Sequence, residues 1–116
     1  MDAVEIGKKC ISIIYDCKRM VSGNDTQGLY NAGQELITYQ AMLISEYANR
    51  EQVYRLEVVK GKEEQGSQAA GEAVAKSTKA YSEYSKMKML FDIVDQQIKF
   101  IKKIVSVKND EYRNQD

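Results

Sequence analysis

The sequence predicts an all-α fold: a single domain with a long, coiled-coil-like antiparallel helical hairpin and a shorter N-terminal helix, three helices in total. Three observations carry this prediction. The 116 residues include no proline, the residue that breaks helix interiors. Apolar residues recur at helical spacing along most of the chain. One stretch poor in apolar residues, GKEEQGSQAAG, separates the two longest periodic segments and contains three glycines.

The first helix is predicted over residues 3–21, because its apolar residues alternate at spacings of three and four. The SGND segment that follows predicts its end. Gly23 suits a left-handed C-terminal cap, and either Asn24 or Asp25 can cap the next helix. The apolar face of the first helix comprises Ala3, Ile6, Cys10, Ile13, Cys17 and Met20.

The second helix is predicted over residues 26–60, with Gly28 and Gly33 weakening its start. A turn is predicted over residues 61–67, where Ser67 can cap the third helix. The alternative is a helix that passes through part of this stretch and turns later. The apolar face of the second helix includes Leu29, Leu36, Ile37, Leu43, Ile44, Tyr47, Tyr54 and Val58.

The third helix is predicted as one unbroken element over residues 68–109, followed by a short tail. Its apolar residues repeat every seven positions for more than four heptads, the pattern of coiled-coil packing. Small residues open this face and large residues close it, so we expect the N-terminal helix to pack at the large-residue end. The face comprises Ala73, Ser77, Ala80, Tyr84, Met87, Phe91, Val94, Ile98, Ile101 and Val105.

A hairpin two or three helices thick leaves much apolar surface in water unless another chain covers it. We therefore expect self-association, as a dimer or a larger bundle, and binding of another protein, which together describe a scaffold or adaptor. The residues predicted to form this oligomer or partner interface are Met87, Phe91, Val94, Ile98 and Ile101.

The formal net charge of zero hides an uneven distribution. Residues 25–60 carry three basic and five acidic side chains, whereas residues 67–109 carry eight lysines and four acids. Solvated helix faces explain this pattern, and so does a basic strip beside Phe100 that follows a phosphate backbone. The second interpretation makes the protein a nucleic-acid-binding accessory factor. Its candidate contacts are Lys99, Lys102, Lys103 and Lys108.

The residue types needed for catalysis and for metal binding are missing from the sequence. It has no histidine, no glycine-rich phosphate loop and no Glu-x-x-His pair, so we predict no enzyme activity, no metal site and no cofactor. Cys10 and Cys17 are about 10 Å apart along one helix, too far for a disulfide, and are expected to be buried thiols. No segment is long and apolar enough to cross a membrane, so we expect a cytoplasmic protein without membrane contacts.

Five of the eight tyrosines lie where the second and third helices are expected to face each other. A tyrosine can pack its ring in a thin helical layer while its hydroxyl stays in water, so we expect these rings to form core. A platform for stacking nucleic-acid bases is the alternative. The five residues are Tyr39, Tyr47, Tyr54, Tyr81 and Tyr84.

The second half of the chain resembles a group of small bacteriophage and prophage proteins. The resemblance rests on a glycine-containing turn, the alanine-rich helix start AAGEAVAK, the segment AYSEY, and an Ile/Lys-rich end that closes on NDEY. Proteins of this group have no assigned function, and their genes often lie beside recombination and single-strand-binding genes. The resemblance implies an accessory role in DNA metabolism in the cytoplasm of a bacterial host. A phage inhibitor of a host enzyme is a further alternative.

Overall fold

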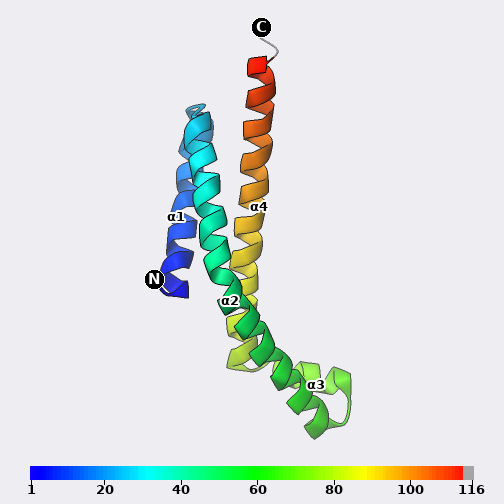
Figure 1. Cartoon of the computed structure of the whole chain (residues 1–116). Coiled ribbons are helices and arrows are strands. Elements are labelled where there is room, and N and C mark those ends of the chain that lie inside the picture. Colours follow the sequence, from blue (N-terminus) through cyan, green and yellow to red (C-terminus); the bar gives the residue numbers. More distant parts are fainter. Residues whose placement is uncertain (114–116) are drawn as a thin grey trace. The chain divides into compact units, whose positions relative to one another are not determined.

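The computed structural model describes residues 1–113, and within them every regular element is a helix, which confirms the all-α prediction. The chain forms α1 (Ala3–Ser22), α2 (Thr26–Gln65), α3 (Gln68–Ala75) and α4 (Lys79–Arg113) (Figure 1). The prediction of three helices is wrong, because residues 68–113 form two helices. The predicted tail begins too early, since α4 continues to Arg113; the rest of that tail lies outside the described residues.

Side-chain caps mark the starts of α1 and α2. The Asp2 side chain accepts a hydrogen bond from the backbone N–H of Glu5 and so starts α1. The predicted left-handed Gly23 is wrong: its φ is −85°, and the left-handed residue is Asn24, with a φ of 56°. Asp25, one of the two predicted candidates, then caps α2 by accepting from the backbone N–H of Gly28 at 2.9 Å.

The turn after α2 lies later than the predicted residues 61–67. Helix α2 passes through Gly61 and ends at Gln65, which agrees with the alternative of a later turn. Gly66 makes the turn with a φ of 76°, a conformation that glycine adopts without steric cost. Ser67 caps α3, as predicted, by accepting from the backbone N–H of Ala70.

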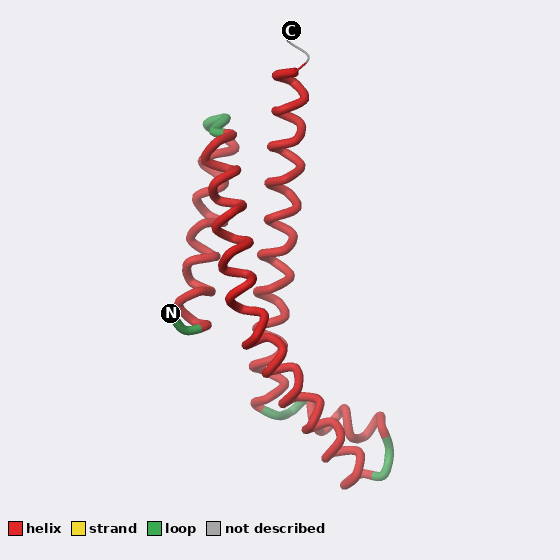
Figure 2. The backbone as a smooth tube through the Cα atoms, viewed as in Figure 1, coloured by secondary structure: helices red, strands yellow, loops and turns green. Residues whose placement is uncertain are grey.

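The predicted unbroken third helix is interrupted at Lys76–Thr78, one of the loops drawn in green in Figure 2. The Ser77 hydroxyl donates to the Val74 carbonyl and the Thr78 hydroxyl donates to the Ala75 carbonyl, both at 2.6 Å. Thr78 Oγ1 also accepts from the backbone N–H of Tyr81. The same two carbonyls also accept from the backbone N–H groups of Ser77 and Thr78, three residues on rather than four, so the regular helical pattern is interrupted between α3 and α4.

The chain divides into two compact units. The first consists of Met1–Leu43 and the chain from Phe91 onward, and is called here the three-helix unit. It contains α1, the first part of α2 and the last part of α4. Its buried apolar side chains come from all three helices and include Cys10, Leu36 and Val94, each at 0% exposure. As predicted, α1 packs at the end of α4 that carries the large residues, where Val21 of α1 lines a groove together with Ile104 and Val107 of α4.

The second unit, Ile44–Leu90, is called the tyrosine unit. In it, Tyr54 stacks on Tyr84 with ring centroids 5.2 Å apart and an angle of 5° between the planes. Tyr54 also contacts Tyr81, and Tyr47 meets Tyr84 edge to face. As residue numbers rise along α2 they fall along α4, so the two segments run antiparallel here. Four of the five tyrosines predicted to form core thus pack between helices, and the fifth, Tyr39, is half-buried in the three-helix unit.

Candidate interaction surfaces

The residues predicted to form an oligomer interface lie mostly inside the chain. Met87, Val94, Ile98 and Ile101 are 3%, 0%, 5% and 3% exposed, and Phe91 is half-buried. Met87 belongs to the tyrosine unit and the others belong to the three-helix unit. The seven-residue repeat thus marks the intramolecular core, and a surface for a partner has to be sought on another face of α4.

That other face carries a second apolar row, which we call the α4 stripe: Ile93, Phe100, Ile104 and Val107. Ile93, Phe100 and Val107 are seven residues apart and are 47%, 48% and 50% exposed. Ile104 lies beside them and is half-buried. The stripe could have been found in the sequence, because its apolar residues recur every seven positions, as those of the core row do. The predicted interface includes residues of one row only, and the stripe is not part of it.

A groove borders the stripe within the three-helix unit. It has a volume of about 490 Å³ and lies between the α1–α2 connection and the last turns of α4. Its apolar lining comes from Val21, Leu29 and three stripe residues, while Lys103, Lys108 and Glu111 contribute charged groups. The stripe is therefore continuous with a larger apolar surface that reaches α1.

The four lysines predicted to contact nucleic acid do not share one face. At about 100° per residue, Lys99 and Lys103 lie on one flank of the stripe and Lys108 on the other, while Lys102 faces nearly opposite to Phe100. Lys99 pairs with Asp95 at 2.9 Å and Lys108 pairs with Glu111 at 3.4 Å. The hydrogen bond from Lys99 lowers the pKa of Asp95. Two of the four cations are thus already paired with a carboxylate.

A second groove, of about 360 Å³, lies between α2 and α4 in the three-helix unit. Gly33 opens it, because a Cβ there would lie 3.1 Å from Ile101 Cγ2. Lys102, Asp110 and Arg113 provide charged groups of both signs around it. Its apolar lining comprises Tyr30, Ile37, Ile98, Ile101 and Val105. With mixed charges and no buried polar side chain directed into it, this groove does not define a ligand chemistry.

The two thiols are unsuited to chemistry. Cys10 and Cys17 are free and are 0% and 1% exposed, which confirms the prediction of buried thiols. Burial raises the pKa of both, and the hydrogen bond from Gln97 opposes this only partly at Cys17. Both thiols stay protonated at neutral pH, and it is the thiolate that acts as nucleophile.

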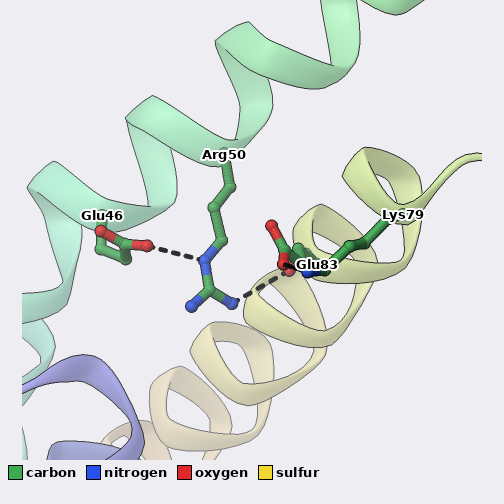
Figure 3. Close-up of polar contacts among 4 residues, drawn as sticks. All are labelled: Glu46, Arg50, Lys79 and Glu83. Atoms are coloured by element: carbon green, nitrogen blue, oxygen red, sulfur yellow. Dashed lines mark hydrogen bonds and ion pairs between the residues drawn. The ribbon is translucent and has the colours of Figure 1, made fainter.

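In the tyrosine unit, Arg50 connects α2 to α4 beside the stacked rings. Its Nε donates to Glu46 at 2.8 Å and its Nη1 donates to the Glu83 backbone carbonyl at 3.2 Å (Figure 3). Lys79 pairs with the Glu83 carboxylate at 3.8 Å. Every charged group in this arrangement already has a partner in the same unit, so its role is to hold the helices together.

Within residues 1–113, no group of three or more metal-ligating side chains comes together. The same part of the chain has no helix with the length and apolar character needed to span a membrane. Comparison with protein families, curated proteins and solved structures finds no match to this chain.

Proposed function

We propose that this protein is a non-catalytic interaction protein, a scaffold or adaptor that binds other protein chains through exposed helix faces. The observation that carries the proposal is the α4 stripe, whose large apolar side chains are about half exposed in a regular row. Single exposed apolar residues are ordinary on protein surfaces, but a row at seven-residue spacing matches what a partner helix covers.

The energetic argument follows from the area that a partner would remove from water. Burial of apolar surface contributes roughly 25 cal/mol per Å², so a stripe of four large side chains supplies several kcal/mol when it is covered. The groove beside the stripe extends this surface toward Val21 and Leu29. A partner helix that lies along α4 would therefore bury both.

We further propose that α2 and α4 form the two arms of an antiparallel hairpin. Within each unit the two helices run in opposite directions, as the colours of α2 and α4 in Figure 1 show, which supports the proposal. The setting that we propose is the cytoplasm of a bacterial host and an accessory role in DNA metabolism, as the resemblance to phage proteins implies.

The test is affinity capture of the tagged full-length chain from native bacterial lysate, with and without nuclease. We expect at least one protein to remain bound after nuclease treatment, and Phe100→Ser combined with Val107→Ser to release it. A control chain with Lys102→Glu keeps the same partner. Loss of everything on nuclease treatment would instead support the nucleic-acid-binding function.

A further inference from the structure

The α4 stripe stays about half exposed in the described chain, and its flanking charges indicate what covers it. Asp92, Lys99 and Lys103 all lie about 60–100° from Phe100 on the same side of the helix. Asp92 and Lys103 make no ion pair with any described residue, whereas Lys99 is paired with Asp95. The flank is thus acidic toward the start of the stripe and basic toward its middle.

We propose that the stripe binds the same stripe of a second copy, with the two α4 helices antiparallel. This inference rests on the proposed function and names its first partner. A two-fold interface brings the same patch of both copies together, so the patch must be complementary to itself. In an antiparallel pair each helix flank meets the identical flank of the other copy, with the order of residues reversed. The acidic start of one flank then meets the basic middle of the other.

The apolar residues define the same register as the charges. If Ile93 lies opposite Phe100 of the second copy, two-fold symmetry also places Phe100 of the first copy opposite Ile93 of the second. This register places Asp92 within about one helical turn of both Lys99 and Lys103 of the second copy. Gln96 then lies at the centre of the pair, where a polar residue among apolar neighbours favours a single register. A parallel pair would instead bring this flank against the opposite flank of the second copy, so Asp92 would not meet Lys99 or Lys103.

The test is a charge exchange between two variants, Asp92→Lys and Lys103→Glu. The dimer contains two symmetry-related contacts between Asp92 of one copy and Lys103 of the other. Each variant alone makes both contacts repulsive, so we expect its dimer dissociation constant to rise about tenfold. Mixing the two variants restores both attractive contacts. We therefore expect the mixed dimer to form with nearly the wild-type constant. The double variant, which carries both exchanges in one chain, recovers in the same way.

The measurements are light scattering at micromolar concentration and native mass spectrometry of the mixed variants, with circular dichroism to show that each variant stays helical. Lys102→Glu is the matched control, because it makes the same charge change on another face and leaves the dimer unchanged. A monomeric wild-type protein overturns the inference. So does a dimer that Phe100→Ser disrupts but that the charge exchange does not restore. Neither result decides the capture experiment, which can still show that the stripe binds a different protein.

Discussion

Two glycines determine how closely α3 approaches α2 in the tyrosine unit. Gly61 and Gly71 are both buried, and a Cβ on Gly61 would lie 2.7 Å from the carbonyl oxygen of Gly71. The atom in the way belongs to backbone, so it cannot rotate aside as a side chain would. Gly61 is therefore kept in the middle of a long helix for its size, although glycine weakens helices by about 1 kcal/mol relative to alanine.

Replacement of Gly61 by alanine should accordingly lower the free energy of unfolding, although a change from glycine to alanine inside a helix usually raises it. In an open helix position the change stabilises by about 1 kcal/mol, but here we expect a loss of about 1–3 kcal/mol because α3 is pushed away. Urea denaturation followed by circular dichroism measures the difference. Ser45→Ala, at an exposed site of the same helix, should stay within about 0.5 kcal/mol of wild type. A stabilised Gly61→Ala chain would contradict the contact.

Asp95 makes stability depend on pH in a defined direction. The hydrogen bond from Lys99 lowers the pKa of Asp95 in the folded chain. The unfolded chain then binds the proton more readily, so this contribution is complete above the usual carboxyl pKa of about 3.9 and is lost as the pH falls through the lower, folded value. The expected consequence is that Asp95→Asn is less stable than wild type at pH 6 and that the difference shrinks toward pH 2.

Urea midpoints of both chains at pH 6 and pH 2 provide the measurement. The control is Asp95→Asn in a chain that also carries Lys99→Gln, where the partner of the carboxylate is already missing and the gap should change less with pH. An unchanged gap between wild type and Asp95→Asn across the range would contradict the role of Lys99.

At the scale of the elements, the break between α3 and α4 shows how side chains interrupt an otherwise continuous pattern. The seven-residue apolar repeat passes through Ala73 and Ser77 into α4, yet both of these residues are exposed. Ser77 and Thr78 bond to the carbonyls of Val74 and Ala75 and so end the helix. Repeat spacing indicates which residues could share a face, and it does not indicate where two hydroxyl residues end a helix.

Replacement of Thr78 by alanine should lower the free energy of unfolding by about 1 kcal/mol, because α4 loses the side chain that accepts from the Tyr81 N–H. Chemical denaturation with near-ultraviolet circular dichroism of the tyrosines reports the change. Thr38→Ala is the matched control: Thr38 lies inside α2 and bonds only back to the Gln34 carbonyl, so alanine there should be neutral or slightly stabilising. Equal losses in both variants would show that Thr78 is not a cap.

At the scale of the whole molecule, buried apolar side chains are concentrated in one of the two units. Of the twelve buried apolar side chains among the described residues, only Ala75 and Met87 lie in the tyrosine unit. The other ten lie in the three-helix unit. Half-buried tyrosine rings take the place of an aliphatic core in the tyrosine unit, and such a layer resists local opening less well.

Hydrogen exchange should therefore separate the two units along a single helix. We expect backbone amides of α2 between residues 46 and 65 to exchange faster than those between residues 30 and 43, because the first group lies over fewer buried contacts. Mass spectrometry of peptides from both stretches measures this. Uniform protection along α2 would show that the chain opens as one cooperative body.

Several predictions from the sequence depended only on local pattern, and these succeeded. The absence of proline and the three-four spacing predicted helices. Ser67 was predicted as a cap, and Asp25 was one of two candidates for the cap of α2. The repeat through Met87, Val94 and Ile98 correctly grouped residues that are all buried. It assigned them to contacts between chains, whereas the structure buries them within one chain. The groove at Val21 and Leu29 could not be predicted, because its walls come from segments about eighty residues apart in the sequence.

Helicity, caps and the two apolar rows of α4 are properties of the sequence itself, because each depends on residues within a few positions of one another. Folding decided which of the two rows became core and which stayed in water, since that choice depends on where α1 and α2 pack. The contact between Gly61 and Gly71 likewise exists only in the folded chain, because close backbone approach is a property of two helices together.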